Sequence, residues 1–447
     1  MATVAVVGGG ITGLTAAHLL KRQGHRPIVL EASARAGGKI RTETFHDIDI
    51  EAGADAFLPR DAFPLEIVRS VGLGDALVSP AVFGAFIWSR GALRKLPPGS
   101  IYGLPRSPTA ARRAGLLSVP GMLRALAEPI VGRQLEGPDV SIGGFVRSRF
   151  GNEVLDRLVD PLLAGTRAGH PDRISLAAGA KEIDALARSN RSLLRALTRT
   201  GTDIGAGSTG FLSVTGGLER LCNALGAQIE DVRLETPVDA IERTAGGYRV
   251  HSAGTALDAE RVVLAVPGDA AAALLTSIAT EAAEVLASIR YLSSALVALA
   301  YPAGSFDPPP GGSGALVPSG EQMLVTGITW YSQKWPAARP PDGAIIMRCF
   351  VGRETDEGAL ELGDDDLVAR VAGDVHTILG IDADPVDRTV FRWTRALPVY
   401  EVGHTERVAR IRAALPPGIA VAGAAYDGTG VPDCMRSAAT AATLVSA

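Results

Sequence analysis

A glycine-rich turn between a strand and a helix, near the amino terminus, limits the fold of this chain more than any other feature. Residues 3–7 (TVAVV) are apolar and largely β-branched, which is typical of a buried parallel strand. Gly8, Gly10 and Gly13 follow as G-x-G-x-x-G, and the apolar residues after them recur at helical spacing. In such a turn the first glycine permits the sharp bend, the second lets a pyrophosphate approach the main chain, and the third lets helix and strand pack closely. The segment therefore predicts a nucleotide-binding α/β unit with phosphates at the helix N-terminus.

A second strand and a second glycine block narrow the expected nucleotide. Residues 27–30 form another apolar, strand-like run that ends at Glu31, whose carboxylate suits the hydroxyls of an adenosine ribose. The chain then reads E-x-x-x-R-x-G-G-K up to Lys39, and EAGADAF follows at 51–57. A nicotinamide dehydrogenase has no need of the added glycine pair, so these blocks set the chain apart from that class.

These motifs resemble those of the FAD-dependent amine oxidase and protoporphyrinogen oxidase superfamily. The resemblance implies non-covalent FAD, with the glycine pair against its diphosphate and the loop 51–57 along its ribityl chain and ring. It also implies that Val238 offers main chain to the adenine and that the closing helix begins at the flavin pyrimidine edge. Trp393 corresponds to a cofactor position of the family but could equally be an aromatic residue of the core. The implied cofactor positions are Gly8, Gly9, Gly10, Ile11, Thr12, Gly13, Glu31, Ala32, Arg35, Gly38, Lys39, Gly53, Ala54, Asp55, Ala56, Val238, Trp393, Gly430, Val431 and Pro432.

The length of 447 residues is too great for one compact core, so we expect several domains. The predicted fold class is α/β plus α+β. A discontinuous Rossmann-like FAD-binding domain is expected at 1–72, 205–268 and 386–447. An antiparallel-sheet substrate domain is expected at 73–90 and 269–385, and a helical domain at 91–204.

Composition excludes several classes of function. The net charge of −4 gives no general affinity for nucleic acid, and no apolar window is long enough to span a membrane. The first strand begins at once, so we expect no leader peptide and a cytoplasmic enzyme. Cys222, Cys349 and Cys434 lie far apart and lack metal-ligand spacing, so they are expected to be reduced thiols with no metal site.

Further segments resemble the oxygen-dependent protoporphyrinogen/coproporphyrinogen oxidase branch over nearly the whole chain. They include GADAFLPR, GNEVLDRLVDPLLAGTRAG, FLSVTGGLERL, KWP, GRETDE, PVYEVGH and GTGVPDC. The resemblance implies that a tetrapyrrole, a porphyrinogen, is oxidised in three flavin turnovers, each passing a hydride to flavin N5, with O2 as acceptor and H2O2 as product. No side chain then needs to act as a catalytic acid or nucleophile, and the next enzyme of haem biosynthesis is an expected transient partner.

Of the two porphyrinogens that the resemblance allows, we expect coproporphyrinogen III to be the substrate, because a chain without a membrane segment and with many arginines suits a tetra-acid. Protoporphyrinogen IX remains the alternative. A flavin amine oxidase would usually need an aromatic pair facing the flavin, which Trp393 and Tyr426 could imitate. A carotenoid desaturase would need an apolar membrane-facing patch, and a non-catalytic FAD-binding scaffold is the last alternative.

The substrate side matches the family less well. Asp61 stands where many relatives have a second basic residue, and Ala85 stands where some have arginine. A carboxylate entering an apolar pocket needs a charge-assisted partner, best a bidentate arginine. Our hypothesis is that Arg167 is the anchor, against the alternative of a surface arginine tied to Asp160 or Asp172. The predicted substrate positions are Arg60, Phe86, Gly165, Arg167, Leu316 and Met347.

The sequence does not decide the role of two basic segments. Residues 90–127 hold seven basic residues and no acid, which fits either a solvated surface or a field that attracts an anionic substrate, a partner or a membrane surface. A predicted helix at 178–199 would align Arg188, Arg191, Arg195 and Arg199 on one face, exposed or substrate-facing. The glycine-rich stretch at 201–210 is expected to be a linker or a lid hinge.

Overall fold

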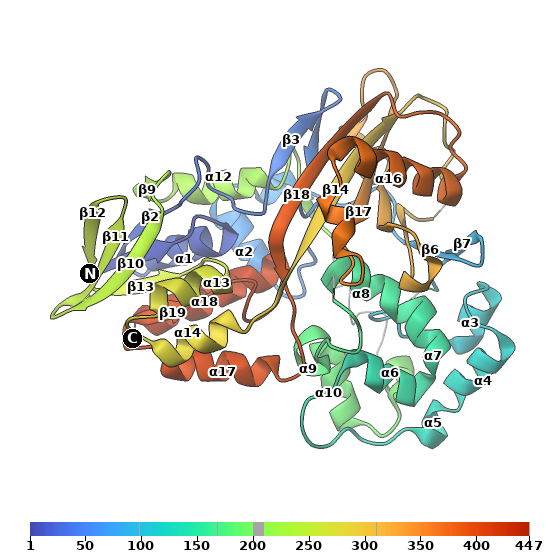
Figure 1. Cartoon of the computed structure of the whole chain (residues 1–447), viewed down its shortest axis with the longest axis horizontal. Helices are drawn as coiled ribbons and strands as arrows, with labels where there is room; N and C mark the ends of the chain where they lie inside the picture. The colour runs from blue at the N-terminus through green and yellow to red at the C-terminus, as the bar shows by residue number, and fades with distance from the viewer. Residues whose placement is uncertain (98, 168, 200–209, 310, 447) are drawn as a thin grey trace.

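The structure is a computed structural model that describes residues 1–97, 99–167, 169–199, 210–309 and 311–446. Three groups of elements lie side by side: a parallel sheet with both termini, a larger sheet, and a cluster of helices (Figure 1). No helix in the described part of the chain is long and apolar enough to cross a membrane. The stretch at 201–210, predicted to be a linker or a lid hinge, lies outside the described residues except for Gly210.

The first group is built on a five-stranded sheet, all of whose strand pairs are parallel. Its strands are apolar on both faces because helices or a small sheet cover each side, as parallel sheets require. In order across the sheet they are β19 (Ile419–Val421), β13 (Arg261–Leu264), β1 (Thr3–Val7), β2 (Arg26–Leu30) and β9 (Asp231–Arg233).

Helices cover one face of this sheet, and a three-stranded antiparallel sheet with further helices covers the other. Val4 and Val6 pack against the first set, whereas Ala5 and Val7 pack against the second. The first set is α1 (Ile11–Arg22), α2 (Phe63–Ser70), α12 (Glu219–Ala227) and α18 (Val431–Ser446). The second is β10 (Val238–Thr244), β11 (Gly247–Ser252), β12 (Thr255–Ala259), α13 (Gly268–Leu275), α14 (Thr280–Ala287) and α17 (His404–Ala414).

The second group is a seven-stranded sheet that carries α16 (Asp364–Leu379) on one face (Figure 1). Its pairs are antiparallel except that β15 and β6 run parallel. In order the strands are β18 (Asp387–Pro398), β14 (Tyr291–Tyr301), β17 (Ile345–Val351), β16 (Val325–Trp330), β15 (Gly314–Leu316), β6 (Phe86–Ser89) and β7 (Ala92–Lys95). This group also includes α15 (Tyr331–Lys334). Two separate antiparallel pairs are formed by β3 (Thr42–Phe45) with β4 (Ile48–Glu51) and by β5 (Leu77–Val78) with β8 (Ser213–Val214).

The third group is helical and shares one apolar core. A π-helical turn, Leu155–Val159, joins two of its helices. The group consists of α3 (Pro108–Arg113), α4 (Val119–Leu126), α5 (Glu128–Val131), α6 (Ile142–Phe150), α7 (Asn152–Val154), α8 (Asp160–Arg167), α9 (Leu176–Gly179), α10 (Lys181–Ser189) and α11 (Leu193–Arg199).

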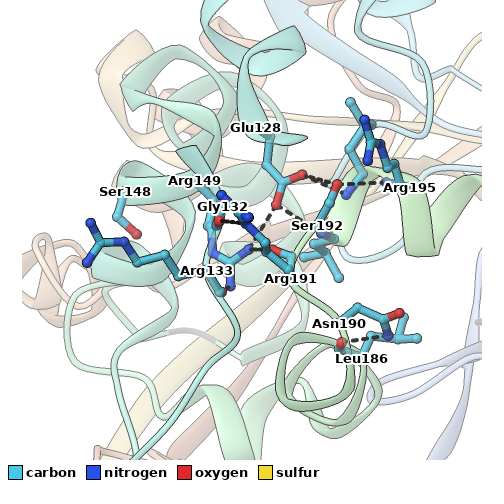
Figure 2. Close-up of polar contacts among 12 residues, drawn as sticks. Glu128, Gly132, Arg133, Ser148, Arg149, Leu186, Asn190, Arg191, Ser192 and Arg195 are labelled. Carbon is cyan, nitrogen blue, oxygen red and sulfur yellow. Dashed lines mark hydrogen bonds and ion pairs between the residues drawn. The ribbon is translucent and has the colours of Figure 1, made fainter. Parts of the chain in front are cut away.

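The predicted single helix at 178–199 is wrong, because the chain breaks after Ser189 and a new helix begins at Leu193. The cause is a buried carboxylate from outside the segment, that of Glu128 (Figure 2). It accepts hydrogen bonds from Ser192 Oγ at 2.7 Å and from the backbone N–H groups of Leu193 at 2.9 Å and Leu194 at 3.1 Å. It therefore caps the second helix.

The four arginines of this segment consequently do not share one helix face. Arg191 lies in the break, and its carbonyl accepts a hydrogen bond from Arg149, whose guanidinium also pairs with Glu128 at 2.9 Å (Figure 2). Of the basic residues at 90–127, Arg90 pairs with Glu153, and Arg124 donates to the carbonyls of Ser148 and Arg149. Part of this charge therefore ties the helices together.

The predicted fold class is confirmed, but the structure departs from the domain boundaries in three places. Strand β18 lies within the range assigned to the FAD-binding domain, yet it pairs along its length with β14 of the larger sheet. Helices α13 and α14 lie within the substrate range but pack on the parallel sheet, and β7 extends the larger sheet past residue 90. Periodicity identifies each element but not the partner that it packs against.

Candidate functional site

A cavity of about 1010 Å³ opens at the carboxyl ends of the parallel strands and extends to the face of the larger sheet. Val7, Leu30 and Ala265 line it where β1, β2 and β13 end. Ligands of open α/β sheets bind at this edge, beyond the carboxyl ends of the strands. Leu296, Phe350 and Trp393 line the other end of the cavity, so one space joins the two sheets.

The glycine turn forms the floor of the cavity. Gly8 has φ of +103°, and a side chain at Gly13 would overlap the carbonyl oxygen of Gly8. Both positions therefore require glycine. Gly10, Ile11 and Thr12 line the cavity at the N-terminus of α1, whose unpaired N–H groups favour an anion. Gly9 and Gly13 are not among the lining residues.

The second glycine block packs directly against the first. Gly10 and Gly37 form a parallel β-bridge, and Gly37 N donates to Gly9 O at 2.8 Å. A Cβ at Gly38 would lie 3.2 Å from Gly10 Cα. Gly38 and Lys39 line the cavity, and burial lowers the pKa of the Lys39 ammonium. The two blocks thus form one cradle of main chain with a cation beside it, which suits a diphosphate.

Glu31 lines the cavity at the end of β2, as does Ala32. Glu31 Oε2 accepts a hydrogen bond from Gly9 N at 2.6 Å, and Oε1 accepts from Ser33 N at 2.9 Å. The carboxylate therefore fixes the glycine turn while it faces the space in which a ribose would lie. Val238 also lines the cavity.

Arg35 holds the cradle from outside and does not line the cavity. Its guanidinium donates to the carbonyls of Gly38 at 2.6 Å and Ile40 at 3.1 Å, and it pairs with Glu219 at 3.1 Å. The predicted direct contact with the cofactor is therefore replaced by a positioning role for this side chain.

The loop 51–57 brings Gly53 and Ala54 to the cavity but turns Asp55 away from it. The Asp55 carboxylate meets Lys334 Nζ at 2.7 Å and Trp335 Nε1 at 3.2 Å, on the far side of the loop. The side chain of Asp55 therefore does not line the cavity, where the sequence predicted a cofactor contact. Ala56 packs in the neighbouring apolar cluster.

Trp393 and the start of the last helix close the opposite wall. Trp393 lines the cavity, and its Nε1 donates to Ala52 O at 2.8 Å, so the ring is tied to the loop 51–57. Val431, the first residue of α18, lines the cavity with Thr429, whereas Gly430 and Pro432 are not among the lining residues.

Of the predicted substrate residues, Leu316 lies on the cavity face of the larger sheet. Cross-strand pairing runs from Leu296 to Phe350, Gly327 and Leu316, and paired residues lie on the same face. Leu296 and Phe350 line the cavity. Leu316 thus continues that face, although it does not itself line the cavity.

Phe86 and Met347 lie on the opposite face, and their prediction as substrate residues is wrong for this cavity. Met347 is fully buried and pairs across the strands with Trp330, and the Phe86 ring lies 5.7 Å from that of Trp330. All three belong to the core beneath α16. The alternation of strand side chains causes the error, since Met347 and Phe350 are an odd number of residues apart.

Arg60 is not among the residues that line the cavity, and the LLAGTRAG turn is described only in part. Arg60 pairs with Glu182 at 2.7 Å and donates to Tyr102 Oη at 2.9 Å, so it joins the loop 51–57 to the helical group. Gly165 and Arg167 lie in α8, and their side chains are outside the described part of the chain. Asp172, one alternative partner of Arg167, pairs with Arg147 at 3.0 Å.

Sequence reasoning missed one wall of the cavity and a fully buried arginine behind the loop 51–57. Val266, Pro267, Ala270 and Leu274 line the cavity from the turn after β13 and from α13. The sequence VVLAVPGDAAAALL is a strand followed by Pro-Gly and a helix, so a signal was present. Arg348, a lone arginine in the apolar strand IIMRCFV, was a second signal.

No group of His, Cys, Asp and Glu side chains among the described residues could hold a metal ion. Cys222, Cys349 and Cys434 are all buried and free. Burial raises the pKa of Cys222 to about 12 and of Cys434 to about 11, so neither is a reactive thiolate.

Comparisons with known proteins agree along the whole chain. A family model described as flavin containing amine oxidoreductase matches residues 11–446. The chain is 32% identical to the coproporphyrinogen III oxidase of Bacillus subtilis (strain 168), over 97% of this chain and 95% of that protein. It is 35% identical to the coproporphyrinogen III oxidase of Mycobacterium bovis, over 98% and 96%. A crystal structure from Exiguobacterium sp. 255-15, described as a candidate protoporphyrinogen oxidase, superposes with a TM-score of 0.87 at 31% identity, over 99% and 98%.

Proposed function

The chain belongs to the family of flavin-containing amine oxidoreductases, and from this premise we propose that it is an FAD-dependent coproporphyrinogen III oxidase. The observation that carries the substrate is the full-length similarity to proteins named for that activity, because the cavity alone would suit many flavin oxidases. The proposed product is coproporphyrin III, with O2 as electron acceptor and H2O2 as the second product.

The residues of the cavity fit non-covalent FAD. Glu31 would hold the adenosine ribose, and Gly10, Gly38 and the α1 N-terminus would hold the diphosphate, where only main chain leaves room for it. Gly53, Ala54 and Trp393 would border the ribityl chain and the ring. When bound, the flavin supplies the two-electron oxidation of the substrate.

The chain itself orients the substrate and keeps water out. The sheet face that ends the cavity is apolar at Leu296 and Phe350, and Leu316 continues it toward the helical group. A flat macrocycle can stack on such a surface, whereas its propionates need cations beyond it. No acid or nucleophile of the chain is required at the reacting carbon.

We expect the purified protein to oxidise coproporphyrinogen III faster than protoporphyrinogen IX. The experiment follows porphyrin fluorescence and peroxide together, and the proposed stoichiometry is three peroxides for each porphyrin. Anaerobic mixing with each porphyrinogen should bleach the flavin absorbance. A clear kinetic preference for protoporphyrinogen IX would overturn the substrate assignment, and a flavin that no porphyrinogen bleaches would overturn the reaction.

A flavin amine oxidase is the weaker alternative. The aromatic pair that such an enzyme needs would be Trp393 with Tyr426, but Tyr426 is buried in the core of the parallel-sheet group. Tyr426 is not among the residues that line the cavity, so the pair does not form there.

For the propionates, we propose Arg167 as an anchor and Arg60 as an assisting cation. The loss of one charge-assisted contact costs about 1.5–3 kcal/mol, so Arg167→Ala should raise KM about ten- to a hundredfold. Flavin content and melting temperature should stay near wild type, and Arg147→Ala, which removes a surface ion pair with Asp172, is a suitable control. A KM within twofold of wild type for Arg167→Ala would place the anchor elsewhere. A cytoplasmic location and transient contact with the next haem-pathway enzyme remain part of this proposal.

A further inference from the structure

A fully buried arginine lies behind the loop 51–57. Arg348 is 0% exposed and sits on β17, between apolar neighbours, on the face of the larger sheet that leads to the cavity. An unpaired buried charge is too costly to keep in a protein, so its contacts must explain its presence.

The guanidinium of Arg348 is tied to the loop itself. One nitrogen, Nη2, donates a hydrogen bond to the carbonyl of Gly53, and Nη1 lies 3.2 Å from Asp55 Oδ2. The rings of Tyr331 and Phe350 flank it at 5.3 and 5.2 Å. Gly53 and Phe350 both contact Arg348 and both line the cavity. Each of them alone therefore separates the guanidinium from the space in which a ligand would lie.

A second cation shares the same carboxylate. Lys334 Nζ lies 2.7 Å from Asp55 Oδ2, and Trp335 Nε1 donates to the same oxygen at 3.2 Å. Burial by itself would raise the pKa of Asp55, but the charges of Lys334 and Arg348 outweigh burial and hold that pKa at about 2. Asp55 is therefore ionised throughout the working pH range.

The charges of this group do not cancel. We call Arg348, Lys334 and Asp55 the loop-cation cluster, which holds two cations and one anion. Another buried carboxylate, that of Glu51, accepts hydrogen bonds from Leu218 N and from Thr42 Oγ1 at 3.2 Å, and it forms no ion pair with Arg348 among the described contacts. Burial raises the pKa of Glu51 to about 7, so its charge offsets the cluster only in part at neutral pH.

We propose that the loop-cation cluster holds net positive charge behind the loop 51–57 and thereby makes the bound flavin a stronger oxidant. Two-electron reduction by a hydride leaves negative charge on the flavin ring, and fixed charges in a dry site act on it more strongly than they would in water. Arg348 and Lys334 are thus positioning residues that act through the loop and touch neither substrate nor flavin. The inference rests on the proposed function only in requiring that FAD is bound.

Because the cluster has two cations and one anion, removing a cation and removing the anion should shift the flavin reduction equilibrium in opposite directions. Lys334→Met removes a cation and should lower the equilibrium constant for flavin reduction against a reference dye about tenfold. For a two-electron couple, a tenfold decrease means that the reduction potential of the flavin is about 30 mV more negative. Asp55→Asn keeps the shape and most hydrogen bonds but removes the anion, so it should raise the same constant about tenfold. Arg348→Met should act as Lys334→Met does, and Arg348→Lys should restore a value near wild type.

A purely structural role would move these variants in one direction or not at all. Arg388→Met is the matched control, because Arg388 is an exposed arginine of the same sheet that pairs with Asp365 on the surface. If Arg348→Met does not fold, the opposite shifts of Lys334→Met and Asp55→Asn still decide the question. Shifts of the same sign, or all within twofold of wild type, would overturn the inference. A colourless wild-type protein would overturn it together with the proposed cofactor, whereas a flavoprotein inactive on porphyrinogens would overturn only the proposed function.

Discussion

Gly10→Val is expected to give a folded protein that does not retain flavin. Gly10 has an ordinary φ of −72°, and the nearest atom to an added Cβ is Gly38 Cα at 3.9 Å, so the backbone and its neighbours accept a side chain. The valine methyl groups would instead fill the cradle between the two glycine blocks. We expect flavin binding at least about a hundredfold weaker, a loss of ~2.7 kcal/mol. Visible absorbance of the purified protein and the Kd of added FAD measure it.

The control for this substitution is Gly373→Val. Gly373 lies within α16 on the outer face of the larger sheet, and an added Cβ there would meet nothing within 4 Å. It should keep its flavin and change stability by only a few tenths of a kcal/mol, because valine is a slightly better helix former than glycine. Full flavin content in Gly10→Val would show that the diphosphate does not lie over this turn.

Glu128→Ala is expected to destabilise the protein more than any surface substitution. The carboxylate is 0% exposed and accepts from Arg149, from Ser192 and from the first turn of α11. Its removal leaves Arg149, itself 7% exposed at the side chain, without its counter-charge. Breaking such a buried pair from one side costs about 3–5 kcal/mol. The loss of stability is measured as the denaturant concentration at which the helical group unfolds. Hydrogen exchange of the backbone amides at 181–199 reports that unfolding.

Glu136→Ala serves as the comparison, since Glu136 is exposed on the segment that follows α5. It should change stability by less than about 0.5 kcal/mol. A Glu128→Ala midpoint equal to that of Glu136→Ala would mean that Arg149 finds other partners. The same experiment would then show that the break before α11 does not depend on this cap.

The glycine turn could be predicted from sequence because its chemistry is local. Gly8, Gly13 and Glu31 are required by steric and hydrogen-bonding needs within one strand–helix–strand unit, and the structure shows each need. The fold class followed from the same unit and from resemblance along the chain. Local motifs of this kind supply most of the residues that we assign to the cofactor.

What could not be predicted depends on partners far apart in sequence. The break in the helix at 190–192 is set by Glu128, more than sixty positions earlier, as the separations of 64 and 65 residues in its hydrogen bonds show. Asp55 was assigned to the cofactor because its loop was correctly placed, but Lys334 turns its side chain to the other side. Periodicity fixes which residues share a face of a strand, yet only the assembled sheet shows which face meets the cavity, and so Met347 was misassigned.

The packing of α18 on α1 sets the order in which parts of the chain can fold during translation. The glycine turn leaves the ribosome long before Met435, Ala438 and Ala442, which cover the apolar face of the helix behind it. The edge strand β19 joins the sheet only after residue 419. The helical group, by contrast, is complete in sequence by residue 199. A nascent chain can therefore fold its helical group while the cofactor cradle still lacks α18, and flavin capture reports that α18 has been made.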